Sequence, residues 1–491
     1  MREHDHDPAG SRLPIKLDST SNGEFEPIPL APVHEHANRL AHEAADQAAR
    51  RLGLDRRSFL VSSCGAASTL LAFNAAFSAE GRRGGYFELP EEARFEPEAA
   101  SAALEGEEFI FDVQGHFVNP RGDWLARLPQ DARPLAGLAA LRGVETDAAR
   151  EYLELFNSEQ FIQDVFLDSD TDLMVLSFVP SRADSEPLTI EEAAETAALV
   201  ERMEGTHRLL LHGRVNPNQD GDLASMDELA ERWGVAAWKT YTQWGPDGRG
   251  FWLDDEDTGI PFLEKARALG VDLIAIHKGL PFGRDSYEHS TCADIGRVAR
   301  RYPDLKFLVY HSGYVPDAAE GPYDPAREDG IDSLVTSLLE NDIAPNSNVY
   351  AELGSTWRFL MRDPDSAAHS LGKLFRHVGE DNVLWGTDSI WYGSPQDQIQ
   401  AFRSFQIDEA LCEAHGYPRL DAGLRAKVFG LNALKPYGRF VTDLLPQFGV
   451  DRIAGERTAY RQAPNPHFRT YGPKTRREFL NLLRWNGGQP A

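Results

Sequence analysis

The sequence is organised around the stretch Phe109-Ile-Phe-Asp-Val-Gln-Gly-His-Phe-Val118. This short apolar run, with acidic residues before it and Asn119-Pro120 after it, predicts a buried strand. Asp112, Gln114 and His116 stand on alternate positions near its carboxyl end, so their side chains point to the same side. A buried strand that ends in polar groups on one side is more typical of a ligand-binding strand than of a plain core strand.

From Phe109 onward, short apolar runs alternate with helical segments. Eight such pairs favour a parallel (β/α)8 TIM barrel, an α/β fold, over an open sheet, and no nucleotide-binding Gly-x-Gly-x-x-Gly follows a strand. We predict strands at 109–113, 172–179, 208–215, 235–241, 271–277, 305–311, 348–353 and 382–388. The main helices are predicted at 191–204, 224–233, 261–269, 291–302, 367–378 and 396–412.

Composition limits the class of protein. The chain has 491 residues, of which 42% are hydrophobic, so a large core can form. Its formal net charge of −27 argues against nucleic acid as a partner, because phosphate binding needs a basic surface. The three cysteines, Cys64, Cys292 and Cys412, lie far apart and form neither a disulfide framework nor a cysteine-type zinc knuckle.

Two segments and a linker precede the barrel. Residues 1–54 are polar, with a helix from about 35 to 52, and we interpret them as a solvated leader; the pair His34 and His36 is read as part of it and not as a metal site. Residues 55–79 begin with Arg56-Arg57 and continue as an uncharged run that resembles a twin-arginine export signal.

An ordinary amphipathic helix after a charged cap is the alternative for 55–79. An export signal implies the twin-arginine machinery as a partner and a periplasmic location, with the cytoplasm as the alternative. The serines of the run argue against a stable membrane span in the mature protein. Residues 80–108, rich in Gly, Glu and Pro, are interpreted as a linker.

Two further segments lie outside the strand–helix pattern. The long connection 119–171 is a candidate lid or pocket wall because of its aromatic residues, which are Trp124, Tyr152, Phe156 and Phe161. After the barrel domain, 109–437, residues 438–491 form a basic extension that is expected to cover the barrel or to contact a second subunit in a homo-oligomer.

Chemically versatile residues recur at the predicted strand ends, where (β/α)8 barrels place their functional groups. A lone histidine there is more often a satisfied core residue, but recurrence at one end of successive strands makes independent structural roles a weaker explanation. Imidazole nitrogens with a carboxylate suit zinc, or manganese where oxygen ligands weigh more. These residues are His116, Lys239, His277, Lys278, His311, Glu352 and Asp388.

Three pieces of sequence resemble the amidohydrolase-related family: Tyr302-Pro-Asp-Leu-Lys-Phe-Leu-Val-Tyr-His-Ser-Gly313, Asp381-Asn-Val-Leu-Trp-Gly-Thr-Asp388 and Phe429-Gly-Leu-Asn-Ala433. The resemblance covers about 109–437. It implies a metal-dependent TIM barrel and includes the branch of the aminocarboxymuconate-semialdehyde and resorcylate decarboxylases.

By this resemblance, His116, His277 and Asp388 match metal-ligand positions, and Gln114 occupies a further one. His311 matches a histidine that binds a second metal or acts as an acid–base group. Lys239 stands where some relatives carry a lysine, occasionally carboxylated to bridge two metals.

The chain departs from the family pattern at two positions. Gln114 replaces the histidine or glutamate that usually begins the first ligand pair, and an amide oxygen is a weaker, neutral ligand. Tyr314 stands where resorcylate-type decarboxylases carry an acidic residue, which counts against decarboxylation by their mechanism.

These features predict a metal-dependent hydrolase that acts on a C–N, ester or lactone bond of a small molecule through a metal-activated water. Asp388 and His311 are the expected catalytic groups, and zinc the expected ion, with manganese as the alternative. Two other readings stay open, a metal-dependent decarboxylase or lyase of an aromatic or enol carboxylate, and an exported non-catalytic barrel with a decayed site. The residues expected to orient the substrate are Lys239, Lys278, Arg284 and Tyr314.

Overall fold

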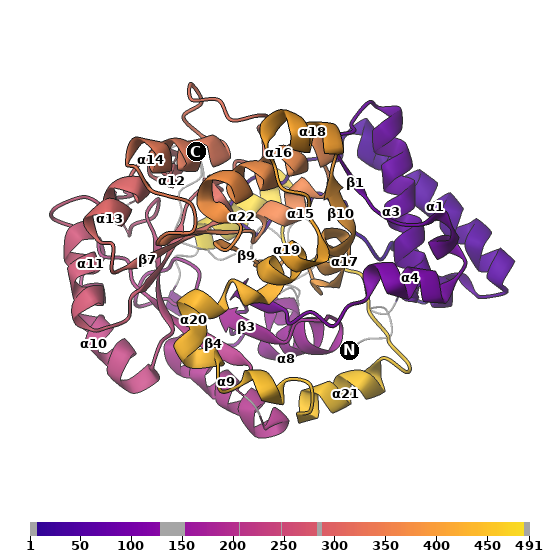
Figure 1. Cartoon of the computed structure of the whole chain (residues 1–491). Helices are drawn as coiled ribbons and strands as arrows, with labels where there is room; N and C mark the ends of the chain where they lie inside the picture. Colours follow the sequence, from indigo (N-terminus) through magenta and orange to yellow (C-terminus); the bar gives the residue numbers. More distant parts are fainter. Residues whose placement is uncertain (1–6, 128–152, 206, 247, 282–286, 486–491) are drawn as a thin grey trace.

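A computed structural model of the chain describes residues 7–127, 153–205, 207–246, 248–281 and 287–485. Eight strands form a nearly closed parallel barrel in sequence order, surrounded by helices (Figure 1). The predicted (β/α)8 TIM barrel is therefore confirmed. The strands are β2 (Phe111–Gly115), β3 (Leu173–Leu176), β4 (Leu209–Arg214), β5 (Ala237–Tyr241), β6 (Leu273–His277), β7 (Lys306–Tyr310), β8 (Val349–Glu352) and β9 (Val383–Leu384).

The last strand joins the first through main-chain hydrogen bonds beyond the short β9. The N–H of Asp388 donates to the carbonyl of Gln114 at 3.0 Å, and the N–H of His116 donates to the carbonyl of Ser389 at 2.6 Å. Since these bonds involve the predicted site residues themselves, barrel closure brings the ends of β2 and β9 together at one rim.

The helices of the barrel follow from the expected pattern. Helix α9, for example, begins with a capping box between Thr189 and Glu192 and ends at Gly205, whose φ of 73° is the left-handed conformation that glycine adopts at no steric cost. The principal helices are α9 (Ile190–Glu204), α10 (Asp222–Trp233), α11 (Gly259–Ala268), α13 (Ile295–Arg301), α14 (Gly330–Glu340), α16 (Pro364–Leu374) and α17 (Gln396–Ser404).

The C-terminal extension closes the amino-terminal end of the barrel. Helix α20 (Leu434–Val441) buries Tyr437 and Val441 among the inward-facing side chains of the strands. Phe448 stacks on Phe109, just before β2, with ring centroids 5.5 Å apart. The functional side chains are consequently confined to the opposite, carboxyl end of the strands.

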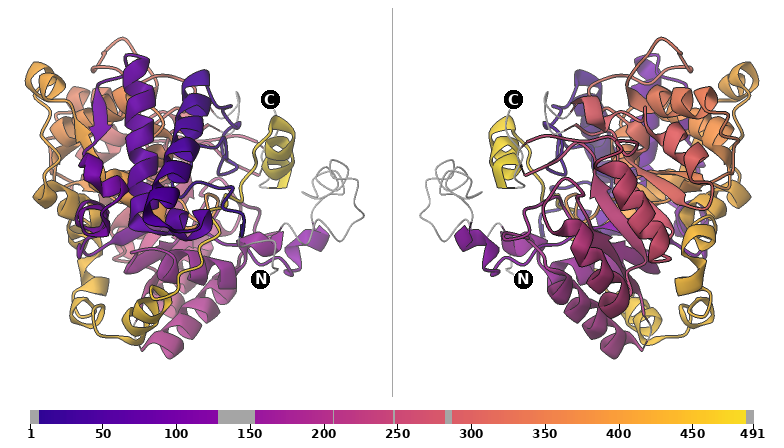
Figure 2. Two further views of the ribbon diagram at one scale, coloured as in Figure 1. Left: turned by 90° about the vertical axis from the view of Figure 1, so that its right-hand side faces the viewer. Right: turned by 90° about the vertical axis from the view of Figure 1, so that its left-hand side faces the viewer.

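The helices between residues 32 and 104 pack on one side of the barrel as an N-terminal layer (Figure 1). The two long helices α1 (Pro32–Leu52) and α3 (Ser63–Ala79) lie side by side (Figure 2, left), with α2 (Arg56–Val61) between them in sequence. Small side chains of α1 such as Ala37, Ala41 and Ala45 are fully buried, which allows this close approach.

The interpretation of 1–54 as a solvated leader is wrong. Residues such as Leu13, Ile15 and Leu17 are at most 8% exposed, because their alternate apolar side chains pack into the core of the molecule. His34 is also buried, and its Nε2 lies 2.9 Å from the carbonyl oxygen of Arg362, so it joins α1 to the barrel layer.

Residues 55–79 are likewise part of the fold. Arg56 donates from Nε to the carbonyl of Gly10 at 2.7 Å, Arg57 donates to the carbonyl of Pro466, and most of α3 is buried. These contacts give no support to an export signal, which stays a prediction. Within the described residues, no helix is both long enough and apolar enough to cross a membrane.

Three smaller expectations also change. The linker 80–108 contains helix α4 (Pro97–Leu104) and strand β1 (Gly85–Phe87), which pairs antiparallel with β10 (Phe405–Ile407). Strand β10 interrupts the single helix predicted at 396–412, so this region divides into α17 and α18 (Glu409–His415). In the long first connection, Phe156 packs on Trp391 at 5.0 Å between centroids, while Tyr152 lies outside the described residues.

Candidate metal centre

The barrel gathers six of the predicted site residues at the carboxyl ends of its strands, with Gln114 near the end of β2. His277 ends β6, His311 directly follows β7, and His116 and Asp388 follow β2 and β9. Lys239 lies within β5. Each is at most 2% exposed, so the centre is shielded from solvent.

The three histidines share one arrangement. On each ring one nitrogen faces a main-chain carbonyl, which only accepts hydrogen bonds, so that nitrogen is assigned the proton. On His277 and His311 the other nitrogen then turns its lone pair toward a carboxylate, which is the usual orientation of a metal-binding histidine, whereas Nε2 of His116 lies at hydrogen-bond distance from Asp388. The carbonyl contacts are His116 Nδ1 to Ser177 at 3.0 Å, His277 Nε2 to Leu280 at 3.4 Å and His311 Nδ1 to Gly354 at 2.6 Å.

The carboxylate that faces two of these histidines is Glu24, from the N-terminal segment. Its Oε1 lies 3.3 Å from Nδ1 of His277, and its Oε2 lies 3.5 Å from Nε2 of His311. One ligand atom from each of the three residues falls within 4.8 Å of the others. A segment expected to be solvated thus reaches the middle of the site.

Asp388 organises the rest of the centre. Its Oδ1 accepts a hydrogen bond from Nε2 of Gln114 at 3.0 Å and lies 3.1 Å from Nε2 of His116. Its Oδ2 accepts from Nδ2 of Asn22 at 2.6 Å and from the hydroxyl of Ser355. Both oxygens are therefore held in place by neighbouring donors.

Burial dominates the proton equilibria of the site. It lowers the pKa of His277 well below the ordinary value and that of His311 to about 4. Burial and the nearby Asp388 raise the pKa of Glu24 well above its usual range. For Asp388, burial alone would raise the pKa, but the hydrogen bond and charge of His116 hold it below its ordinary value. At neutral pH the two lowered imidazoles are neutral.

The backbone around the site adopts the left-handed region at non-glycine residues. The φ values are 61° at His311, 55° at Ser312, 53° at Ser355 and 58° at Asp388. Such conformations cost about 1–3 kcal/mol each and cluster where a side chain must be aimed at a functional site. Here they aim the site side chains from the ends of β7, β8 and β9.

Lys239 is a buried cation beside the centre. Its Nζ lies 3.7 Å from the ring centroid of Tyr310 and 4.4 Å from that of Tyr241. Among the described residues, no acceptor forms a hydrogen bond with it. Burial lowers the pKa of Lys239 to about 7 although Glu24 and other carboxylates oppose this shift.

The structure does not bring every predicted residue to the centre. Lys278 points into a separate ion pair, with Nζ 2.9 Å from Oδ1 of Asp294. Tyr314 is buried, and its pKa is raised by burial and by Glu320, a carboxylate outside the centre. Arg284 lies outside the described residues.

Gln114 reaches the centre through its nitrogen. Because a carboxylate only accepts hydrogen bonds, the amide nitrogen must be the group that faces Asp388, and the amide oxygen points toward Gly354. This oxygen has no hydrogen-bond partner among the described residues. As the centre stands, Gln114 orients Asp388 instead of contributing an oxygen to the cluster of Glu24, His277 and His311.

The donor set fits a divalent cation. When Glu24 is ionised, its oxygens and the lone pairs of neutral His277 and His311 all accept, so a cation between them would stabilise this form of the centre. Nε2 of His311 indeed has no hydrogen-bond donor among the described residues. Imidazole nitrogens combined with carboxylates suit zinc or manganese.

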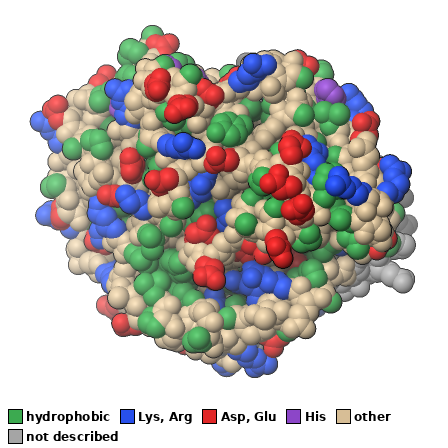
Figure 3. Space-filling model, turned by 45° about the vertical axis from the view of Figure 1, so that its right-hand side comes forward, with side chains coloured by type: hydrophobic (Ala, Val, Ile, Leu, Met, Phe, Trp, Pro, Cys, Tyr) green, Lys and Arg blue, Asp and Glu red, His purple; other side chains and the backbone are tan. Residues whose placement is uncertain are grey.

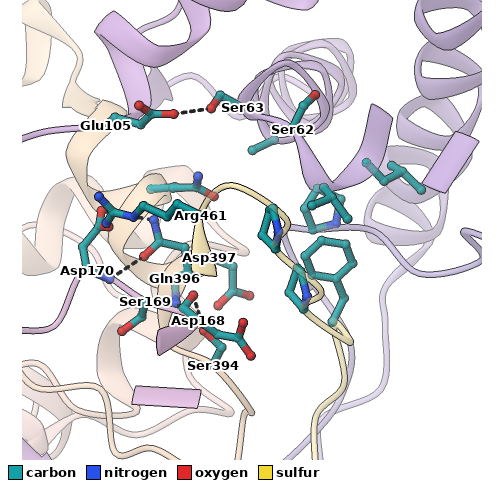
Figure 4. Close-up of a pocket in the computed structure, with 18 of the residues that line it drawn as sticks. Ser62, Ser63, Glu105, Asp168, Ser169, Asp170, Ser394, Gln396, Asp397 and Arg461 are labelled. Atoms are coloured by element: carbon teal, nitrogen blue, oxygen red, sulfur yellow. Dashed lines mark hydrogen bonds and ion pairs between the residues drawn. The ribbon is translucent and has the colours of Figure 1, made fainter. Parts of the chain in front are cut away.

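A cavity of about 480 Å³ lies elsewhere, along the seam between the N-terminal layer and the barrel (Figure 4). It is lined by none of the histidines at the strand ends. Its charged groups pair with one another: Asp170 accepts from Nε2 of Gln396 at 3.1 Å and forms an ion pair with Arg461. We therefore place the chemistry at the buried centre and not in this cavity.

Reasoning from the sequence missed Asn22, Glu24 and Ser355. The apolar alternation of Leu13, Ile15 and Leu17 could have marked a buried extended segment, but no pattern in the sequence gives the place where that segment docks.

The sequence model described as amidohydrolase matches residues 111–439. A search of curated proteins finds no match.

Several solved structures are similar at low identity. They include a 5-carboxyvanillate decarboxylase from Novosphingobium aromaticivorans (17% identity, 68% of this chain and 97% of that chain, TM-score 0.44). Another is a 2,6-dihydroxybenzoate decarboxylase from Rhizobium (15% identity, 68% of this chain and 99% of that chain, TM-score 0.38). A third is a 4-oxalomesaconate hydratase from Rhodopseudomonas palustris (15% identity, 69% of this chain and 98% of that chain, TM-score 0.38).

Proposed function

The chain belongs to the amidohydrolase family, and from that membership we propose that it is a metal-dependent carboxy-lyase acting on a small organic carboxylate. This proposal adopts the second reading of the sequence in place of hydrolysis. It concerns the buried centre at the carboxyl ends of β2, β6, β7 and β9.

The ion would be held by His116, His277 and Asp388, with His311 beside them. A bound divalent cation would attach substrate oxygens and withdraw electron density from the carbon that loses its carboxylate. The main-chain carbonyls behind the three rings fix which nitrogen faces the ion. Elemental analysis of the purified protein would distinguish zinc from manganese.

The observation that supports a carboxylate substrate is the state of Lys239. A buried ammonium is costly unless an anion or another acceptor compensates it. Within the described part of the chain its Nζ has no hydrogen-bond acceptor, and it lies over the faces of Tyr241 and Tyr310. A substrate carboxylate would supply the acceptor that this cation lacks.

In the reaction, the bond between the substrate carbon and its carboxylate breaks, and carbon dioxide leaves without the bonding electron pair. That pair remains on the substrate carbon, which then takes up one proton. We assign the transfer of this proton to the pair of Asp388 and His116, whose Oδ1 and Nε2 lie 3.1 Å apart and can share one proton. The overall change replaces the carboxylate by hydrogen and needs no oxidant or reductant.

Asp388 also weighs against hydrolysis. A hydrolase of this type needs a carboxylate oxygen that is ready to accept a proton from water. Here Oδ1 accepts from Gln114, and Oδ2 accepts from Asn22 and Ser355. Because these donors favour its ionised form, Asp388 is better suited to bind a cation than to take a proton from water.

The test is a panel of aromatic and enol carboxylates and their esters, amides and lactones, incubated with metal-loaded protein. Carbon dioxide release that requires metal, and that is lost in the Asp388→Asn variant, is expected. Cleavage of the esters, amides or lactones with no release of carbon dioxide would assign the protein to the hydrolases instead.

A further inference from the structure

The centre contains a carboxylate that does not come from the barrel. Thr20–Phe25 crosses the carboxyl end of the strands, and each of its described side chains is at most 5% exposed. Glu24 projects from this segment between His277 and His311. A glutamate buried in this position is stable in its ionised form only beside a cation.

We propose that Glu24 is a metal ligand, so that the N-terminal segment Thr20–Phe25 completes the metal site of the barrel. The inference rests on the metal dependence of the proposed function and adds a ligand from outside the barrel. It is independent of whether the substrate loses carbon dioxide or is hydrolysed.

The distances match those between ligands of one ion. Two atoms bound at about 2.1 Å to a tetrahedral ion lie about 3.4 Å apart. The Glu24 oxygens lie 3.3 Å from Nδ1 of His277 and 3.5 Å from Nε2 of His311. A direct hydrogen bond between nitrogen and oxygen is shorter, most often about 2.9 Å. The geometry therefore resembles a ligand set more closely than a pair of hydrogen bonds.

The segment holds Glu24 rigidly enough for this role. The hydroxyls of Thr20 and Thr470 lie 2.6 Å apart, and the N–H of Ser21 donates to the carbonyl of Pro473 at 2.8 Å. The ring of Phe25 packs edge-on against Phe359 with centroids 4.6 Å apart. These contacts tie the segment to the C-terminal extension and to the barrel on both sides of the carboxylate.

Asn22 aligns the carboxylate with the rest of the site. Its Nδ2 donates both to Asp388 and to Oε2 of Glu24, and its Oδ1 accepts the N–H of Glu24 at 2.9 Å. One side chain therefore fixes the two carboxylates relative to each other. This is the support that a preorganised metal site requires from the residues behind its ligands.

The ligand also compensates for Gln114. An amide at this position brings no charge to the ion, and its nitrogen is turned toward Asp388. Glu24 restores an anionic oxygen ligand from a different part of the chain.

The test is the binding of Zn²⁺ and of Mn²⁺ to metal-free, full-length protein, measured by competition with a chromogenic chelator and by elemental analysis. We expect Glu24→Gln to lower the affinity at least about tenfold to a hundredfold, since loss of even a supporting group costs that much. The matched control is Glu26→Gln, which removes an exposed carboxylate paired with Arg476 in the same segment and is expected to leave the affinity unchanged.

Partial recovery of metal affinity in the double variant Glu24→Gln with Gln114→Glu would directly support the proposal that Glu24 supplies the anionic oxygen that Gln114 lacks. Wild-type affinity and stoichiometry in Glu24→Gln would overturn the proposal, because the ion would then bind without this carboxylate. If that variant does not fold, amide hydrogen exchange of the wild type decides: added metal should slow exchange at Gly23 and Glu24, and unchanged exchange would overturn it. Because no substrate is present, a negative result in the carboxy-lyase assay leaves this test intact.

Discussion

Oε1 of Glu24 lies 3.3 Å from Nδ1 of His277, although one residue stands near the beginning of the chain and the other ends strand β6. The contact joins a segment outside the barrel to the ligands that the barrel strands provide. It places a carboxylate of the N-terminal segment within the candidate metal centre.

Asp388→Asn should abolish most activity without unfolding the protein. An amide cannot exchange a proton as the carboxyl group does, and it replaces an anionic ligand, so kcat should fall about 10²-fold or more. Turnover and metal content of the folded variant are the measurements. Asp381→Asn, a change in the same part of the chain at an exposed ion pair with Lys427, should leave both unchanged.

The two buried lysines at the strand ends should behave differently. Lys239→Gln removes the cation that lacks an acceptor among the described residues, so KM for a carboxylate substrate should rise about tenfold to a hundredfold, equivalent to about 1.5–3 kcal/mol. Stability should change little or improve. A KM equal to that of the wild type would remove Lys239 from substrate binding.

Lys278→Gln is the matched comparison. It breaks a fully buried ion pair and leaves Asp294 without its cation, which costs about 3–5 kcal/mol of stability. Chemical denaturation should show this loss, whereas KM of the remaining folded enzyme should stay close to that of the wild type.

The positions of these residues show how far sequence reasoning reaches. The approximate positions of the eight barrel strands were predictable because buried parallel strands are short continuous apolar runs, and their parallel order brings His116, His277, His311 and Asp388 to one rim. Glu24 was not predictable, because its contacts depend on where an irregular segment docks. No local periodicity encodes that.

Lys278 and the N-terminal layer illustrate the same limit. Lys278 follows a strand end as the site residues do, but its side chain turns to Asp294, and a sequence cannot distinguish the two directions. The apolar composition of α3 is shared by export signals and by a helix buried against α1.

The free energy of unfolding should fall as the pH decreases from about 6.5 to 4, because His34 is buried in its neutral form. Burial, followed by the charge of Arg362, lowers the pKa of this histidine to about 4 in the folded protein. As the pH decreases, His34 of the unfolded chain therefore binds its proton first. This lowers the free energy of unfolding by about 2 kcal/mol at pH 5 relative to pH 7. Above the unfolded pKa its contribution is fully present.

Denaturant titrations at pH 7 and pH 5 measure this effect. His34→Gln should reduce the pH dependence by about the same amount, while His36→Gln, at a less buried position of the same helix, should not. An unchanged pH dependence in His34→Gln would show that other groups cause it.

Locking the N-terminal segment should trap the metal. The hydroxyl oxygens of Thr20 and Thr470 lie 2.6 Å apart, so cysteines at both positions place their sulfurs near bonding distance. The proposed ligands are at most 5% exposed, so we expect the ion to leave when Thr20–Phe25 lifts from the barrel. In the oxidised double variant Thr20→Cys with Thr470→Cys, loss of metal to excess chelator should be slower than in the reduced form. Equal rates in the two forms would show that the ion leaves by another route, and the single variant Thr20→Cys controls for the substitution itself.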